Sequence, residues 1–251
     1  MTSAAVIIPA RYASTRFPGK PLALIAGKPM IQHVYERAMK SRSSQAVFVA
    51  VDDRRIFECV EGFGGKALMT SENHPSGTDR IAEAVQKIEN FEVIVNVQGD
   101  EPFIEPQMID DCIELLADTR ADMSTLVKKI GNAHELTSPH VVKVVWDDEG
   151  FALYFSRSPI PFYRDEWADS VNFTNKTVSY KHIGIYGYTR DALFTITSQP
   201  RNWLEKAESL EQLRALTLGL KIKVKETTFE TLGIDLPEDR EKAELWVNTS
   251  L

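Results

Sequence analysis

The first stretch of the chain that could do chemistry is a cationic segment from Ala10 to Lys20. It combines small residues with three cations, Arg11, Arg16 and Lys20. In such a segment, backbone N–H groups and serine or threonine hydroxyls can contact phosphate oxygens, while arginine and lysine neutralise their charge. The spacing therefore predicts a triphosphate site, and the competing interpretation is a solvated basic loop.

A second stretch is acidic. No Asp or Glu occurs from Met1 to Tyr35, whereas seven occur between Gln98 and Thr119 without any Lys or Arg. Within this stretch, Asp100 follows an apolar run and could hold Mg²⁺, which prefers a few carboxylates together with phosphate oxygens and water. The alternative is that Asp100 only caps a turn. A cationic and an anionic segment suit an anion held beside metal ions, although two solvated faces explain the same charges.

The elements that must position these residues alternate in the first half of the chain. Continuous apolar runs predict buried strands, and apolar residues at helical spacing predict the helices between them. The strands are expected at Ala4–Pro9, Ala46–Val51, Ala67–Thr70 and Val93–Val97. The helices are expected after Pro29, after Asp52 or Asp53, after Ser76, and at Met108–Leu116. This pattern is typical of a parallel sheet covered on both faces. Ligands bind beyond the carboxyl ends of such strands, where both chemical segments would lie.

The second half is richer in strands. They are expected at Met123–Ile130, Val141–Trp146, Phe151–Phe155, His182–Tyr188 and Lys221–Glu226, with helices at Ser209–Leu218 and Pro237–Val247 and a loop at Ile160–Lys176. No linker of the Pro, Gly and Ser type divides the chain. We therefore expect one α/β domain over residues 1–251, with a strand-rich lobe for dimerisation or substrate at about residues 140–190.

Composition excludes several classes of protein. The chain has 251 residues, 43% of them hydrophobic, and a net charge of −7, which is ordinary for a globular protein and argues against nucleic-acid binding. No apolar run is long enough to span a membrane, and the N-terminus lacks the features of a secretory signal. Two cysteines cannot form a disulfide framework, and no nicotinamide fingerprint or zinc-protease motif is present. A cytoplasmic enzyme without a membrane or nucleic-acid partner is the expectation.

Several separate motifs resemble the 3-deoxy-manno-octulosonate cytidylyltransferases over almost the whole chain. These are PARYASTRFPGKPL at 9–22, SGTDR at 76–80, VNVQGDEP at 95–102, VKVV at 142–145, ALYFSR at 152–157, KHIGIYGY at 181–188, LEQLR at 210–214 and GIDLPED at 233–239. The resemblance implies a nucleotide-diphospho-sugar transferase-like fold with a mostly parallel central sheet flanked by helices, and a homodimer that requires Mg²⁺. It also implies transfer of CMP from CTP to the eight-carbon sugar acid KDO, which feeds lipopolysaccharide biosynthesis.

The resemblance assigns roles to individual residues. Those expected to bind the nucleotide are Ala10, Arg11, Ser14, Thr15, Lys20, Ser76, Gly77 and Arg80. Asp100 and Asp235 would hold the metal, and together with Lys20 they would be the catalytic residues. From the residues alone, Asp235 could equally begin the last helix.

The expected sugar-binding residues are Gln98, Arg157, His182, Tyr186, Glu211 and Gln212. Arginine suits the sugar carboxylate, and the other side chains suit its hydroxyls. Considered alone, His182 would be a structural histidine at a strand start and Glu211 a solvated residue. The alternating pattern would place His182 and Tyr186 on one strand face.

Two features depart from the family pattern, namely the unmatched segment Phe162–Thr177 and the residue Leu236, which replaces a common Thr. The alternatives are an enzyme for 8-amino-KDO or a sialic acid, a glycosyltransferase, and a non-catalytic nucleotide-binding regulator.

Overall fold

The computed structural model describes residues 3–13, 17–165, 178–239 and 243–245. The chain forms two compact units: the first comprises Met1–Glu114 and Glu230–Leu251, and the second Leu115–Phe229. The strand-rich lobe expected at about 140–190 lies inside the second unit. Whether the two units act as one domain stays a prediction. Among the described residues, no helix is both long and apolar enough to cross a membrane.

The first unit is built on four parallel strands in the order β6-β1-β4-β5. They span Ala4–Ala10 (β1), Ala46–Val51 (β4), Ala67–Met69 (β5) and Val93–Asn96 (β6). In β1, the side chains of five consecutive residues, Ala4 to Ile8, are fully buried. Such unbroken burial is what a parallel strand covered on both faces requires. The parallel sheet expected from the sequence is confirmed.

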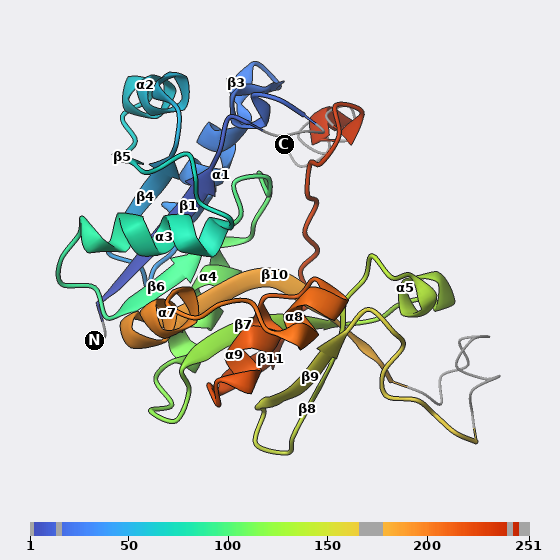
Figure 1. Ribbon diagram of the computed structural model, residues 1–251. Coiled ribbons are helices and arrows are strands. Elements are labelled where there is room, and N and C mark those ends of the chain that lie inside the picture. The colour runs from blue at the N-terminus through green and yellow to red at the C-terminus, as the bar shows by residue number, and fades with distance from the viewer. Residues whose placement is uncertain (1–2, 14–16, 166–177, 240–242, 246–251) are drawn as a thin grey trace. The chain divides into compact units, whose positions relative to one another are not determined.

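Helices connect these strands (Figure 1). They span Met30–Ala38 (α1), Arg54–Gly62 (α2), Gly77–Gln86 (α3) and Pro106–Leu115 (α4), with a 3₁₀ turn at Lys20–Leu22 (η1) and a small hairpin of Leu24–Ile25 (β2) and Lys28–Pro29 (β3). Asp53 caps α2 by accepting the N–H of Arg55, and Ser76 caps α3 by accepting that of Asp79. These caps satisfy otherwise unpaired donors of the first turn, so both helices begin where their capping residues predict.

The C-terminal part of the first unit returns to its N-terminal part. Ile234 and Ala243 form a buried cluster with Ile25 and Met30, against which Phe17 and Phe103 pack. Residues 234–239 are therefore anchored beside the segments that follow β1 and β6. The helix expected at Pro237–Val247 lies partly outside the described residues.

The second unit has a mixed sheet. Strand β7 (Met123–Lys129) pairs in parallel with β11 (Ile222–Glu226) and antiparallel with β10 (Tyr180–Thr189). Strand β10 also pairs with β8 (Lys143–Trp146), which pairs with β9 (Ala152–Ser156), both antiparallel. Its helices span Ala133–Thr137 (α5), Arg190–Thr197 (α7), Trp203–Glu208 (α8) and Gln212–Thr217 (α9).

One expectation for the second unit is wrong in detail, and a second holds despite an irregular pairing. The helix expected to begin at Ser209 begins at Gln212, because Ser209 adopts a left-handed conformation (φ 52°) that ends α8 instead. The alternation expected at His182–Tyr188 holds from His182 to Gly187, where partly buried and buried residues take turns. The pairing of β10 with β7 shifts between Ile183 and Tyr186, where three steps along β10 match one step along β7. An insertion of two residues keeps the two-residue period, so His182 and Tyr186 stay on one face.

Candidate active site

A cavity of about 270 Å³ lies in the first unit at the carboxyl ends of its strands. It is lined by Pro9, Ala10, Arg11, Lys20, Pro21, His74, Pro75, Ser76, Gly77, Arg80, Gln98, Gly99, Asp100 and Asp235. These residues come from the segments after β1, β5 and β6 and from the C-terminal return. The cavity therefore brings together the cationic and the acidic segments at the sheet edge where the sequence predicted a ligand.

Tyr12 holds the beginning and the end of the cationic segment together. Its N–H donates to Asp52 Oδ1 at 2.9 Å, and its carbonyl accepts the N–H of Gly19 at 3.0 Å. The guanidinium of Arg55 lies 3.4 Å from the centre of the Tyr12 ring. Gly19 has a φ of 69°, and a β-carbon there would lie 3.2 Å from the same ring, so this turn favours glycine.

This closed turn determines what its neighbours can contact. Ala10 is buried at the end of β1, Arg11 is exposed beside the cavity, and Lys20 begins η1. Ser14 and Thr15, expected to bind the nucleotide, lie outside the described residues, as does Arg16. The structure thus places Ala10, Arg11 and Lys20 at one cavity, as the sequence predicted.

Lys20 joins the two carboxylates expected to hold a metal. Its Nζ lies 2.7 Å from Asp100 Oδ2 and 3.4 Å from Asp235 Oδ1. The backbone draws the two acids together, because Ile234 N–H donates to the carbonyl of Asp100 at 2.9 Å. The turn that carries Asp235 is held by Asp239, whose carboxylate accepts the N–H groups of Asp235 and Leu236. Two acids separated by 135 positions, from 100 to 235, are therefore close enough to share one cation.

Gly99 allows the acidic segment to approach β1. A β-carbon at this position would lie 2.6 Å from the carbonyl oxygen of Pro9, which is closer than real β-carbons approach backbone oxygens. A β-carbon at Gly77 would lie 3.4 Å from Pro9 Cγ, which is a tight but ordinary contact. Glycine at 99 is therefore a steric requirement for Asp100 to lie beside the cationic segment.

The pair of carboxylates fits a magnesium ion. Mg²⁺ is usually bound by one or two carboxylates together with substrate phosphates and water, and a cage made only of protein groups is unusual. Among the described residues, no group of three or more His, Cys, Asp or Glu side chains could hold a metal. Asp100 and Asp235, beside a cavity that the cationic segment also lines, match the usual arrangement. Next to them, burial and the charge of Asp100 raise the pKa of Glu101 to about 7.

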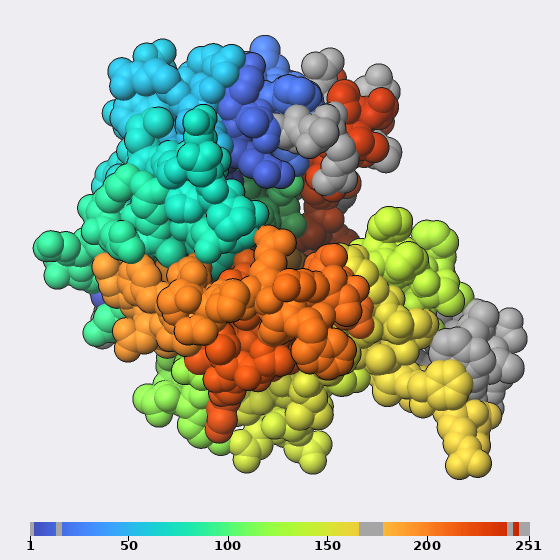
Figure 2. All heavy atoms as spheres, viewed as in Figure 1, coloured from blue at the N-terminus to red at the C-terminus, as the bar shows by residue number. Residues whose placement is uncertain are grey.

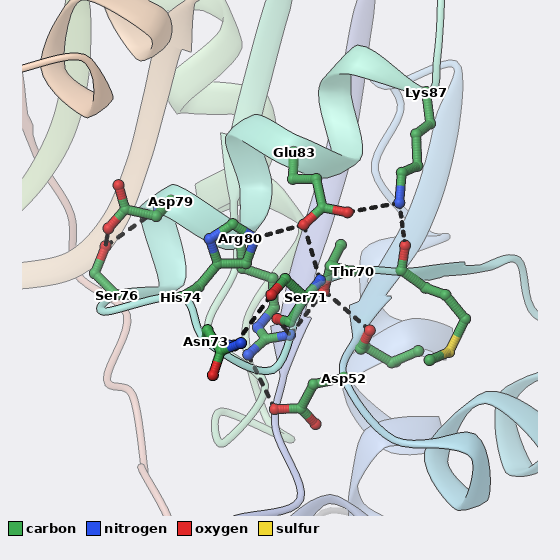
Figure 3. A network of polar contacts seen from close by, with 12 residues as sticks. Asp52, Thr70, Ser71, Asn73, His74, Ser76, Asp79, Arg80, Glu83 and Lys87 are labelled. Carbon is green, nitrogen blue, oxygen red and sulfur yellow. Dashed lines mark hydrogen bonds and ion pairs between the residues drawn. The ribbon is translucent and has the colours of Figure 1, made fainter.

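Arg80 and Asp52 form a buried ion pair behind the cavity (Figure 3). Arg80 Nη2 donates to Asp52 Oδ2 at 2.9 Å, and its Nη1 donates to Thr70 Oγ1 at 2.7 Å and to the carbonyl of Ser71 at 3.2 Å. Burial lowers the pKa of Arg80, and the charge of Asp52 opposes that effect. Because Asp52 also accepts the Tyr12 N–H, one carboxylate links the expected nucleotide-binding segments that follow β1 and precede α3.

The expected sugar-binding residues fall into separate groups. Gln98 lines the cavity of the first unit and donates to Asn96 Oδ1 at 3.2 Å. In the second unit, Tyr186, Glu211 and Gln212 line a second, much smaller cavity. Glu211 is not simply solvated, because its Oε2 accepts a hydrogen bond from Arg214 Nη2 at 3.1 Å.

His182 lies beside Tyr186 despite the irregular strand. Their ring centres are 5.1 Å apart. Thr125 Oγ1 lies 2.7 Å from the carbonyl of Ile185 and 2.9 Å from His182 Nε2. Burial lowers the pKa of His182 to about 3 and raises that of Tyr186 well above its ordinary value, so both side chains are neutral near pH 7. Thr125 Oγ1 also lies 3.2 Å from the carbonyl of Ile183. With its proton donated to the nearer carbonyl, that of Ile185, the hydroxyl would accept a proton from Nε2 of His182 and leave Nδ1 as an acceptor.

Arg157 is held by backbone carbonyls. Its Nε donates to Glu208 O at 2.6 Å and its Nη1 to Pro139 O at 2.8 Å, while Nη2 lies 3.4 Å from Ser209 O. These bonds place the guanidinium beside the left-handed turn that precedes α9. The structure gives no contact between Arg157 and the cluster of His182 and Tyr186.

Sequence reasoning did not single out several residues that organise the site. His74 and Pro75 line the first cavity. Asp52 and Thr125 bind Arg80 and His182, which were expected to bind substrate, and Glu83 binds His74. Only the loop before α3 carried a signal, since Ser76 with Asp79 three residues later marks a helix start and hence a turn before it. The others act through contacts between distant segments.

Comparison with known proteins identifies the family of the chain. The family model described as cytidylyltransferase matches residues 5–222. A protein of Thermodesulfovibrio yellowstonii named 3-deoxy-manno-octulosonate cytidylyltransferase is 53% identical, covering 97% of each chain. One of the same name from Geobacter sulfurreducens is 55% identical, covering 94% of this chain and 96% of its own.

Solved structures give the same result. A CMP:2-keto-3-deoxy-manno-octonic acid synthetase complexed with CTP is 43% identical, with a TM-score of 0.92 and full coverage of both chains. A 4-diphosphocytidyl-2C-methyl-D-erythritol synthase from Anaerococcus prevotii, at 12% identity and a TM-score of 0.65, shares the fold alone. The chain therefore belongs to the cytidylyltransferase family and, within it, to the 3-deoxy-manno-octulosonate cytidylyltransferases.

Proposed function

We propose that this enzyme transfers CMP from CTP to the anomeric hydroxyl of KDO and releases pyrophosphate. One observation carries the proposal: Lys20 lies between Asp100 and Asp235 at a cavity that the cationic segment also lines. A triphosphate in this cavity would meet cations from one segment and a metal-binding pair of acids from two others. The sugar product of this reaction, CMP-KDO, would supply lipopolysaccharide assembly.

The reaction is a direct displacement at phosphorus. The C2 hydroxyl oxygen of the sugar forms a bond to the α-phosphorus of CTP, the hydroxyl proton passes to water, and the bond to the departing pyrophosphate breaks. Such a transfer needs no covalent intermediate on the protein, so the contribution of the chain is positioning and charge neutralisation. Lys20 and Arg11 would stabilise the phosphate charge, and the segment beginning at Ser76 would contact the nucleoside.

The cofactor would be Mg²⁺, held by Asp100 and Asp235. When bound, this ion lowers the pKa of a coordinated hydroxyl and withdraws charge from phosphate oxygens. The ammonium of Lys20, 2.7 Å from Asp100 and 3.4 Å from Asp235, partly neutralises the two carboxylates.

The sugar acid would be recognised by Gln98, Arg157, His182, Tyr186, Glu211 and Gln212. Neutral His182 offers Nδ1 as an acceptor for a sugar hydroxyl, and the high pKa of Tyr186 keeps its hydroxyl a donor. Glu211, fixed by Arg214, offers carboxylate oxygens to further hydroxyls. Three of the five N–H groups of Arg157 face backbone carbonyls, which leaves two for the sugar carboxylate.

We further propose a cytoplasmic homodimer. This proposal rests on the resemblance to a family of homodimers. Light scattering on a size-exclusion column should give the mass of two chains. A cytoplasmic location follows from the need for CTP.

The experiment that tests the reaction is pyrophosphate release by purified protein with Mg²⁺, CTP and KDO. Parallel tubes contain N-acetylneuraminate or 8-amino-KDO in place of KDO, or UTP in place of CTP. Release only with CTP and KDO is the expected result. Release with another sugar alone would move the assignment to that sugar, and no release with any pair would contradict the transferase proposal.

A further inference from the structure

Glu83 of α3 holds the loop that precedes this helix, although it does not line the cavity itself (Figure 3). Its Oε2 accepts the N–H of Ser71 at 2.8 Å and lies 2.5 Å from Nε2 of His74, while its Oε1 lies 2.7 Å from Nζ of Lys87. One carboxylate oxygen therefore ties two positions of the loop, 71 and 74, to the helix. The bonds from Lys87, Ser71 and His74 outweigh burial and lower the pKa of Glu83 to about 2.

The same helix also binds the loop through the guanidinium of Arg80. Arg80, three residues before Glu83 and hence on the same side of α3, donates to the carbonyl of Ser71 at 3.2 Å and to Thr70 Oγ1 at 2.7 Å. Both backbone groups of Ser71 are thus bound to charged side chains of one helix. Hydrogen bonds to charged groups are stronger than those between neutral groups, so this end of the loop is firmly attached.

The other end of the loop enters α3 at Ser76, whose side chain caps the helix. Between these two attachments lie His74 and Pro75, and both line the nucleotide cavity together with Ser76. Because an ionised carboxylate can only accept hydrogen bonds, the bond to Glu83 requires a proton on Nε2 of His74 and so sets the orientation of the ring. The space-filling view shows the outer side of α3, in teal, at the surface of the first unit (Figure 2).

We propose that Glu83 is a positioning residue of the nucleotide site, which fixes residues 71–76 and holds the His74 ring as part of the cavity wall. This role of Glu83 rests on the proposed function, since the ligand of that cavity is taken to be CTP. Glu83 then contributes to CTP affinity without touching CTP, and it has no role toward the sugar acid or in the transfer step.

The test compares Glu83→Ala, Glu83→Gln and wild type by direct CTP binding in calorimetry without sugar, and by steady-state kinetics. Loss of two charged hydrogen bonds to the loop should raise the Kd and KM for CTP about tenfold in Glu83→Ala. The KM for the sugar acid and kcat should stay within about twofold of wild type. Glu83→Gln keeps one acceptor oxygen and should lie between the two.

Two matched controls separate positioning from general loss of stability. Glu58→Ala removes an exposed carboxylate of α2 that pairs with Arg54 and does not touch the loop. Lys87→Met removes the ion pair of Glu83 and the hydrogen bond from Lys87 to the Met69 carbonyl, but leaves the bonds of Glu83 to Ser71 and His74. Both should change CTP binding by less than about twofold, as expected for exposed ion pairs.

A double-mutant cycle with His74→Ala gives a second readout. If Glu83 acts through His74, the effect of the double variant on CTP binding should be smaller than the product of the two single effects. Fully multiplicative effects, or an unchanged Kd in a folded Glu83→Ala protein, would overturn the inference alone. Failure of the wild-type protein to bind CTP would overturn the proposed function instead, together with the inference that rests on it.

Discussion

At the residue scale, Asp100 is the side chain on which the proposed chemistry depends most. Asp100→Asn keeps the size of the side chain but removes the charge that faces Lys20 and would bind Mg²⁺. We expect kcat to fall by about 100-fold or more, because an amide is a poor ligand for this ion. Pyrophosphate release measures the rate, and thermal unfolding checks that the fold is retained. Glu114→Gln, an exposed acid of the same stretch, is the control; near-normal turnover in Asp100→Asn would contradict the metal assignment.

Gly99 permits a second prediction about a single residue. In Gly99→Ala the new β-carbon would lie 2.6 Å from the Pro9 carbonyl, so the segments after β1 and β6 must move apart. We expect the free energy of unfolding to fall by about 1–3 kcal/mol and turnover to fall with it. Urea unfolding and the pyrophosphate assay measure both. Gly62→Ala, where a β-carbon meets nothing within 4 Å, should be neutral or stabilising, and an equal effect of both substitutions would contradict the steric argument.

Individual residues were predictable from the sequence to different degrees. The charge and small neighbours of Lys20 and the position of Asp100 after a strand were visible locally. Asp235 was identified only through the resemblance. The sequence around it gives no sign that the N–H of Ile234 donates to the carbonyl of Asp100. Asp52 was read as a possible helix cap, yet in the fold it links Arg80 and Tyr12, while Asp53 caps the helix. Such roles depend on contacts between distant segments.

At the element scale, the irregularity of β10 is maintained by Thr125 on the neighbouring strand. Thr125→Val keeps the shape but removes the hydroxyl that joins Ile185 O and His182 Nε2. We expect the KM for the sugar acid to rise about tenfold, since a lost buried hydrogen bond costs about 1–3 kcal/mol and frees the His182 ring. Steady-state kinetics with each substrate varied in turn measures this, and the KM for CTP should not change.

A matched control belongs to the same prediction. Thr197→Val removes a hydroxyl of α7 that bonds only to the carbonyls of its own helix, and it should leave both KM values unchanged. Nitrogen-15 spectra of His182 should report the Nε2–H form in wild type and lose that preference in Thr125→Val. A Thr125→Val enzyme with a normal KM for the sugar acid would contradict the role assigned to this strand pair.

Most elements of the first unit were predictable because each parallel strand is an unbroken apolar run with a cap or turn beside it. The start of α9 was predicted wrongly because a non-glycine residue, Ser209, takes a left-handed conformation. Helices α7 and α8 were not expected, although Thr189 and Asn202 both cap them through their side chains. Capping residues alone are weak signals when no apolar stripe follows them.

At the scale of the whole molecule, the motifs predicted the fold and the reaction class, while the division of the chain stays a prediction. The lobe expected at about 140–190 lies inside the second unit, which runs from Leu115 to Phe229. Strands β7 and β11 belong to it because they pair with each other and, through β7, with β10. Pairing between strands nearly 100 positions apart leaves no local mark in the sequence, so the extent of a unit cannot be read from composition.

The pH dependence of stability gives the last prediction. Burial lowers the pKa of His182 to about 3, whereas an unfolded histidine titrates near its ordinary value of 6.5. Below that value the unfolded chain binds a proton that the folded chain does not, so this stability is present above pH 6.5 and is lost progressively as the pH falls toward 3. Between pH 7 and 5 the free energy of unfolding should fall by about 2 kcal/mol more in wild type than in His182→Asn, as measured by urea unfolding. Both pH 7 and pH 5 lie above the range in which protonation of Glu83, whose pKa is about 2, would reduce the contribution of Glu83 to the free energy of unfolding. Identical pH dependence in the two proteins would mean that His182 is not held neutral by burial.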